Sequence, residues 1–213
     1  MDQLPILDEV EKQKKRGVLL VLTGPSGSGK DTVLARLQER FPKMVKIVTT
    51  TSRGKREKES EGHPYYFKSR DEFESLIAEG EFFEWVEFRG ELYGTQKKTL
   101  MDALETGEGV IWKIEAKGVK NSKEKIKQMV ARVVFVFLTT ESVEMMRDRV
   151  RSDEGEEGAK TRFNESLVVW EMKQYEDCDY LVVNNDHNLE ETVAQIEAIM
   201  EAKRLQIIPA KES

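Results

Sequence analysis

The sequence predicts an α/β fold, a doubly wound parallel sheet of about five strands. Two observations predict it. Along most of the 213 residues, short apolar runs typical of buried strands alternate with longer segments of helical periodicity. A glycine-rich stretch, residues 24–32, also stands directly between one apolar run and one such helix. Folds of this class bind ligands at the carboxyl ends of their strands, so we expect this stretch to line the ligand site.

The glycine-rich stretch has the context of a phosphate-binding P-loop. It follows the unbroken apolar run 18–23, and the helix after it ends before Pro42. Glycines let the backbone turn sharply and bring N–H groups close to an anion, to which the helix adds its positive end. The pattern G-x-x-x-x-G-K-[ST] is met through Lys30, but Asp31 stands at the Ser/Thr position. A glycine-rich loop that binds nothing is the alternative, and the flanking strand and helix disfavour it.

Composition excludes several classes of function. Charged residues of both signs make up 35% of the chain, and the net charge is −6, which argues against general nucleic-acid binding. Cys178 is the single cysteine, so the chain forms no internal disulfide, and we expect a reducing cytoplasm. No stretch approaches the roughly 20 apolar residues of a membrane span, and no signal peptide is visible.

The remaining core elements follow in alternation. Four further strands are expected at 44–49, 109–115, 132–138 and 180–184. Helices are expected at 95–105, 116–129, 141–150, 162–176 and 189–203. Residues 152–160 are acidic, contain glycine and lack apolar periodicity, which predicts a mobile loop. Residues 1–16 and 205–213 are expected to be tails.

Residues 50–94 predict an inserted, strand-rich lobe. The polar stretch 50–62 cannot be core, and the short strand 65–67 follows it. Ser69 and Glu72 form a capping box that opens a helix. Residues 82–88 alternate in polarity for part of their length, as a half-exposed strand does. The core domain is then expected to comprise residues 17–49 and 95–204.

At this point the sequence resembles the guanylate kinase family, from about Val18 to Arg204. The resemblance rests on several short motifs in the right order, which together are far more specific than the P-loop alone. Beyond that loop they are Thr51-Ser52-Arg53-Gly54-Lys55-Arg56, Gly62-His63-Pro64-Tyr65-Tyr66-Phe67, Phe82-Phe83-Glu84-Trp85, Tyr93-Gly94-Thr95 and Val183-Asn184-Asn185-Asp186. The resemblance implies transfer of the γ-phosphoryl group of ATP to GMP, with Mg²⁺, an inserted GMP-binding lobe and a helical lid at about 147–164.

The resemblance assigns the GMP-binding residues. Arg53, Arg56, Tyr65 and Tyr93 would hold the phosphate, for which guanidinium forks and phenolic hydroxyls are suited. Glu84 would accept from the N1–H and exocyclic amine of guanine, and adenine has no proton at N1. The other positions implied near GMP are Thr49, Gly94, Thr95 and Glu115.

The resemblance also assigns residues to ATP and to the transferring phosphoryl group. The ATP-binding positions would be Gly24, Pro25, Ser26, Gly27, Ser28, Gly29, Lys30, Asp31, Thr32 and Asn184. Lys30 and Arg53 would act in catalysis. The lid arginines depend on the register: a gapless alignment gives Arg149, whereas a shift by two residues gives Arg147, Arg151 and Arg162. We expect Arg149, Arg151 and Arg162 to be the ones available, and Arg147 to lie on the helix surface.

Two positions depart from the family pattern near the expected metal. Asp31 replaces the P-loop hydroxyl, and Lys113 replaces an acid at the end of the third strand. Together the changes conserve local charge, so we expect Asp31 to take the acidic role near Mg²⁺ and Lys113 either to pair with it or to touch a phosphate.

Two alternative functions remain at this point. One is a sugar-phosphate kinase similar to ribose 1,5-bisphosphate phosphokinases, against which the intact base-reading residues count. The other is a guanylate-kinase-like module that binds phosphorylated peptides, against which the preserved P-loop counts. The expected partners are ATP and GMP, with no nucleic acid and no membrane, and the chain is expected to act as a monomer or homodimer.

Overall fold

A computed structural model describes residues 17–56, 59–106, 109–185 and 188–204. The tails expected at 1–16 and 205–213 lie outside these residues. The expected parallel sheet of five strands is confirmed, with the spatial order β2-β7-β1-β8-β9. Its strands are β1 (Leu19–Thr23), β2 (Val45–Ile47), β7 (Val110–Lys113), β8 (Val133–Thr139) and β9 (Tyr180–Val183).

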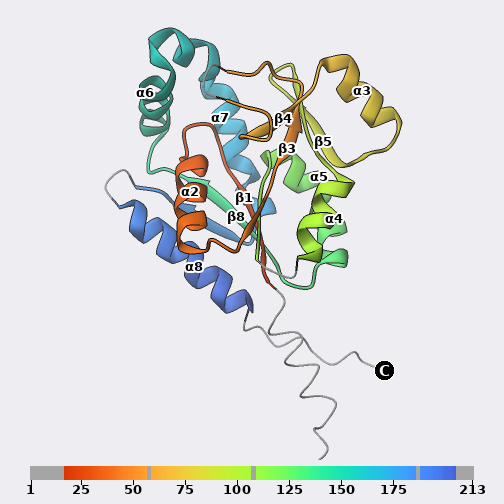
Figure 1. Ribbon diagram of the computed structural model, residues 1–213. Helices are drawn as coiled ribbons and strands as arrows, with labels where there is room; N and C mark the ends of the chain where they lie inside the picture. Colours follow the sequence, from red (N-terminus) through yellow and green to blue (C-terminus); the bar gives the residue numbers. More distant parts are fainter. Residues whose placement is uncertain (1–16, 57–58, 107–108, 186–187, 205–213) are drawn as a thin grey trace, which may run out of the picture.

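Helices cover both faces of this sheet, as Figure 1 shows. On one face α2 (Lys30–Arg40) and α8 (Leu189–Arg204) pack on the side chains of β1 that include Leu20 and Leu22. On the other face α4 (Lys97–Glu105) and α5 (Ala116–Met129) pack on Leu19 and Val21. Because every residue of β1 is buried, its sequence is a continuous apolar run without alternation.

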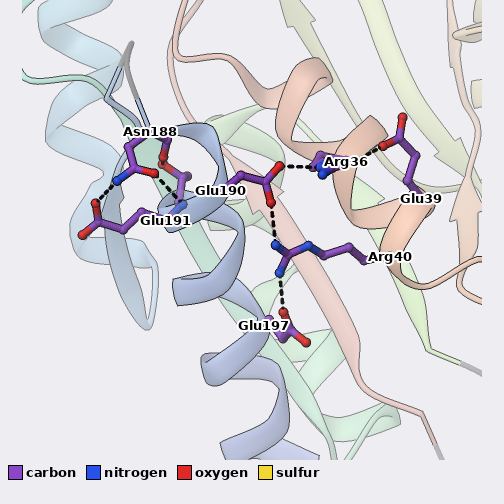
Figure 2. Close-up of polar contacts among 8 residues, drawn as sticks. Arg36, Glu39, Arg40, Asn188, Glu190, Glu191 and Glu197 are labelled. Carbon is purple, nitrogen blue, oxygen red and sulfur yellow. Dashed lines mark hydrogen bonds and ion pairs between the residues drawn. The ribbon is translucent and has the colours of Figure 1, made fainter.

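Ion pairs between α2 and α8 hold together the two helices of the first face. Figure 2 shows Arg36 and Arg40 of α2 sharing the carboxylate of Glu190 at the start of α8, at 2.6 and 2.5 Å. Arg40 also pairs with Glu197, about two turns further along α8, at 2.7 Å. These exposed ion pairs add to the apolar packing between α8 and α2, the helix that begins at the glycine-rich loop.

A second sheet of four strands forms the inserted lobe, in the order β4-β3-β6-β5. Its elements are β3 (Thr49–Thr51), β4 (Tyr65–Phe67), α3 (Arg70–Ala78), β5 (Phe82–Phe88) and β6 (Glu91–Gln96). The capping box of Ser69 and Glu72 is present at the start of α3. Phe73 of α3 stacks on Phe82 and, with Leu92, makes the lobe's own small core.

The single strand expected at 44–49 is wrong. The chain forms two strands in different sheets, because β2 pairs with β7 whereas β3 pairs with β4 and β6. The buried threonines of β3 have strand propensity as good as that of β2, so the sequence gives no sign of the change of sheet at Val48.

The mobile loop expected at 152–160 is also wrong. These residues belong to a long helix, α6 (Val143–Arg162), which is kinked at Gly155, where φ is 73° and ψ is 175°. Few of its described residues are buried, among them Met146, Val150 and Ala159, so the apolar periodicity is weak. The helix expected at 162–176 is α7 (Glu165–Met172), capped by Asn164, followed by the 3₁₀ helix η1 (Lys173–Asp177).

Candidate active site

The glycine-rich loop between β1 and α2 turns on glycines in conformations that other residues rarely adopt. Gly24, Gly27 and Gly29 all have positive φ, at 146°, 80° and 87°. A Cβ atom at Gly27 would lie 2.3 Å from the Met146 carbonyl oxygen of α6, so only glycine fits there. Lys30 Nζ folds back over the loop and donates to the carbonyl oxygens of Gly24 and Pro25 at 2.6 and 2.9 Å.

A cavity of about 410 Å³ opens in front of this loop. The predicted ATP residues on its wall come from the loop, the first turn of α2 and the end of β9. They are Ser26, Gly27, Gly29, Lys30, Asp31, Thr32 and Asn184. Burial lowers the pKa of Lys30, and Glu115 and Glu171 oppose that shift.

Arg149 ties α6, which holds the segment expected to form a lid, to the loop. Its Nη2 donates to the Asn184 carbonyl oxygen at 2.9 Å, and its Nη1 donates to that of Ser28 at 3.3 Å. The Asn184 side chain donates to the same Ser28 oxygen at 2.9 Å. Arg149 therefore lies at the mouth of the P-loop cavity, whose wall it joins.

The other lid arginines lie elsewhere. Arg151 pairs with Asp148 and Glu156 of its own helix, at 3.2 and 2.9 Å. Arg147 pairs with Glu165 at 3.1 Å and its guanidinium lies over the ring of Phe163. Arg162 ends α6, and its side chain lies outside the described part of the chain.

A second, narrow cavity of about 20 Å³ lies between the lobe and the core. Six predicted GMP residues line it together, although they come from five elements or their ends: Thr49, Tyr65, Glu84, Tyr93, Gly94 and Glu115. Thr95 lies directly behind them. The rings of Tyr65 and Tyr93 meet edge to face, with centroids 5.9 Å apart.

Glu84 is the buried acid of this cavity, with 8% of its surface exposed. Desolvation raises its pKa to about 7, and nearby Glu115 adds to the rise, whereas the hydrogen bond from Thr95 opposes it. The Thr95 hydroxyl donates to Glu84 Oε1 at 2.8 Å, and the indole N–H of Trp112 donates to that hydroxyl oxygen at 2.9 Å. This relay fixes one carboxylate oxygen, and the other lies against Gly118 of α5.

Arg53 and Arg56 meet at Glu59, which the sequence had not singled out. The Glu59 carboxylate accepts from the Arg53 guanidinium at 2.8 Å and from the Arg56 backbone N–H at 2.9 Å. Desolvation opposes the shift, but these donors hold the pKa of Glu59 below its ordinary value. The Arg53 guanidinium lies over the ring of Tyr65, with its Cζ 5.5 Å from the centroid, so Arg53 lies beside a residue that lines the second cavity.

Asp31 and Lys113 form the expected pair. Lys113 Nζ lies 2.6 Å from Asp31 Oδ1 and 5.1 Å from the centroid of the Tyr65 ring. Partial desolvation at the cavity wall acts to raise the pKa of the Asp31 carboxyl, but the Lys113 ammonium outweighs it and the pKa is lowered. Burial likewise opposes the charge of Lys113, yet Tyr65 and Asp31 raise its pKa above the ordinary value. Both groups are thus charged at neutral pH.

Glu171 is a further buried acid at the P-loop, with 1% of its surface exposed. Desolvation raises its pKa to about 7, and the positive charge of Lys30 opposes the rise. Glu171 lies three residues after Val168, and the two are the buried residues of α7. Nothing in the sequence singled Glu171 out.

The residues near Asp31 suit a magnesium ion whose remaining ligands are phosphate oxygens. Among the described residues no group of three His, Cys, Asp or Glu side chains is close enough to hold a metal by itself. The Asp31 side chain is 69% exposed on the wall of the P-loop cavity, and its Oδ1 is engaged by Lys113. Mg²⁺ in nucleotide sites takes one or two carboxylates together with substrate phosphates and water, which this arrangement can supply.

Three comparisons with known proteins bear on this site. The family model described as guanylate kinase matches residues 16–203. Guanylate kinases of Carboxydothermus hydrogenoformans and Rhizobium meliloti are each 35% identical, over 89% and 91% of this chain and 90% and 86% of their own. The crystal structure of guanylate kinase from Anaplasma phagocytophilum superposes with a TM-score of 0.70 at 30% identity, covering 90% of this chain and 88% of that one.

Proposed function

Because the chain belongs to the guanylate kinase family, we propose that its two cavities hold ATP and GMP and that the γ-phosphoryl group passes between them. The products are ADP and GDP. No helix among the described residues is long and apolar enough to cross a membrane.

One observation carries the proposal. The P-loop cavity and the Glu84 cavity are adjacent and share three wall residues, Tyr65, Lys113 and Glu115. A nucleoside triphosphate on the loop and an acceptor in the second cavity would therefore meet across that wall. In-line phosphoryl transfer needs this positioning more than it needs any covalent help from the protein.

The residues around the second cavity suit guanine and a monophosphate. Glu84 accepts from the N1–H and amine of the base, while Thr95 and Trp112 hold the carboxylate in place. Arg53 and Arg56, with Tyr65 and Tyr93, bind the phosphate. Glu59 bridges the two arginines in the present structure, and we infer that the dianionic phosphate of GMP competes for those same donors.

The P-loop cavity suits the triphosphate. The loop amides and Lys30 receive the phosphates, so the Lys30 ammonium exchanges its carbonyl partners for phosphate oxygens. Arg149 stands at the mouth of the cavity to neutralise the transferring group. Arg151 and Arg162 stay predictions for a closed lid. Mg²⁺ would be held by Asp31 and phosphate oxygens, and when bound it neutralises charge on the donor phosphates.

The acceptor assignment is tested by binding. Arg53→Ala should weaken GMP binding at least tenfold in calorimetric titration and leave ATP binding within about twofold, since a charge-assisted hydrogen bond contributes about 1.5–3 kcal/mol. Arg70→Ala is the matched control, because Arg70 lies in the same lobe but pairs with Glu74 and Glu87 on the surface. A loss of ATP binding with GMP binding unchanged would place the arginines on the wrong substrate.

A further inference from the structure

Lys113 is a buried cation that lies on the boundary between the two cavities. Its side chain is only 10% exposed, yet it lines both the P-loop cavity and the Glu84 cavity. It ends β7, the strand beside β1, so the backbone of the parallel sheet fixes its position next to the loop. The family pattern has an acid here, so the role of this lysine is not inherited from that pattern.

Two contacts aim the Lys113 ammonium at that boundary. Asp31, on the first turn of α2, approaches from the P-loop side at 2.6 Å. The ring of Tyr65 approaches from the lobe side, with its centroid 5.1 Å from Nζ. A buried ammonium costs free energy unless it is paired, so these two contacts explain how the charge is kept there between substrates.

We propose that Lys113 is a catalytic residue that contacts the transferring phosphoryl group and neutralises its charge. The inference rests on the proposed function. In the step, the bond from the γ-phosphorus to the oxygen shared with the β-phosphate breaks, and a bond to a phosphate oxygen of GMP forms. Lys113 stays an ammonium ion throughout and transfers no proton. Asp31 positions it from the donor side.

A purely structural pair makes a different prediction. If Lys113 served only to balance the charge of Asp31, raising the Mg²⁺ concentration would restore the activity of Lys113→Met, because the metal cation would take over that balance. If Lys113 acts on the phosphoryl group, the loss in kcat persists at saturating Mg²⁺. The two accounts thus differ in how the activity of Lys113→Met depends on Mg²⁺.

The experiment uses the full chain with ATP, Mg²⁺ and GMP. Lys113→Met should lower kcat by roughly 100- to 1000-fold, the scale of one lost electrostatic group in a preorganised site. The KM values for ATP and GMP should stay within about threefold. Lys113→Arg should keep most of the activity. Lys98→Met, which removes an exposed lysine paired with Asp102 on α4, is the matched control and should match the parent.

A binding measurement separates catalysis from folding. A bisubstrate analogue, adenosine and guanosine joined through five phosphates, should bind Lys113→Met at least tenfold more weakly than the parent, while ATP and GMP alone bind nearly as before. Thermal unfolding verifies that Lys113→Met is folded. If it is not, Lys113→Gln is used in its place, with the same expected loss of affinity for the bisubstrate analogue.

Three results would overturn the proposal: kcat of Lys113→Met within threefold of the parent, kcat of Lys113→Met restored to within threefold by saturating Mg²⁺, or unchanged affinity for the bisubstrate analogue. None of these touches the proposed function, which fails only if the parent protein does not phosphorylate GMP.

Discussion

The guanine-binding role proposed for Glu84 would couple substrate choice to pH through one residue. Its carboxylate must be ionised to accept two hydrogens from guanine, but desolvation in the folded protein raises its pKa to about 7. Glu115 is the charged group that faces it, and Thr95 is its hydrogen-bond donor. At neutral pH the site is therefore only partly in the form that binds GMP.

We predict that kcat/KM for GMP falls by up to about tenfold per pH unit below about 7, because free enzyme with a protonated Glu84 must lose that proton. Glu84→Gln should lower kcat/KM by roughly 10- to 1000-fold and remove this component of the pH profile. The phosphate of GMP itself titrates near pH 6, and it does so equally in assays of the parent and of the variant. Dividing the kcat/KM profile of the parent by that of the variant therefore leaves the contribution of Glu84. Parallel profiles would contradict the assignment.

The same shift affects stability with a definite sign. Between about pH 4.5 and 7 the unfolded chain releases the Glu84 proton while the native protein retains it, so stability falls as pH rises through that window. Glutamine does not titrate, so the stability of Glu84→Gln lacks this dependence on pH. The difference in melting temperature, variant minus parent, should therefore increase from pH 5 to pH 8.

Single residues were predictable from the sequence where a short motif carries them. Glu84, Tyr65 and Tyr93 lie in one cavity as expected, and Lys113 meets Asp31. Glu59, Glu171 and the indole of Trp112 were not expected in the site. Glu171 and Trp112 act through contacts with residues distant in sequence. Glu59 is one acid among several in an ordinary polar stretch. No local sequence pattern encodes either situation.

At the scale of elements, the lid helix α6 is the part whose form was mispredicted. Its sequence lacks apolar periodicity because most of its surface is exposed, and it is helical even so. Helix α5, by contrast, runs over the expected residues, because its buried side chains recur at regular spacing. The change of sheet at Val48 was missed for a different reason, since strand propensity does not say which sheet a strand joins.

The kink of α6 predicts a hinge in the lid. Gly155 has φ 73° and ψ 175°, a region open essentially to glycine alone, and no atom would contact an added Cβ within 4 Å. Gly155→Ala therefore acts through the backbone, with a cost of about 1–3 kcal/mol for the kinked form. We expect kcat to fall with ATP binding little changed, because Arg149 precedes the kink.

Gly90→Ala is the matched control for that hinge. Gly90 also has positive φ, at 76°, and no neighbour within 4 Å of an added Cβ, but it lies in the β5–β6 turn. Stopped-flow kinetics should show a slower turnover for Gly155→Ala and not for Gly90→Ala. Equal turnover in both variants would mean that the kink has no part in lid movement.

At the scale of the whole molecule, the arrangement of two sheets explains why two substrates meet. The five-stranded sheet presents the P-loop at its carboxyl edge, and the four-stranded sheet brings the Glu84 cavity to the same edge. The second cavity holds about 20 Å³, enough for about one water molecule. A purine therefore needs more room than the present arrangement of these side chains leaves, so we expect the site to open for GMP and close around both nucleotides.

The fold class was fully predictable, because the alternation of buried strands and helices is a property of the entire chain. The division into a core at 17–49 and 95–204 and a lobe at 50–94 stays a prediction, as do action as a monomer or homodimer and location in the cytoplasm. These depend on motion, on surfaces between copies and on the cell, which the fold of one chain does not determine.

The most direct test is a coupled ADP-release assay of the full chain with ATP and Mg²⁺, comparing GMP, AMP, UMP and ribose 1,5-bisphosphate as acceptors. The account predicts a kcat/KM for GMP at least about 100-fold above that for AMP, since a buried carboxylate left unpaired rejects adenine. Equal rates with AMP and GMP, or faster ADP release with ribose 1,5-bisphosphate than with GMP, would contradict it.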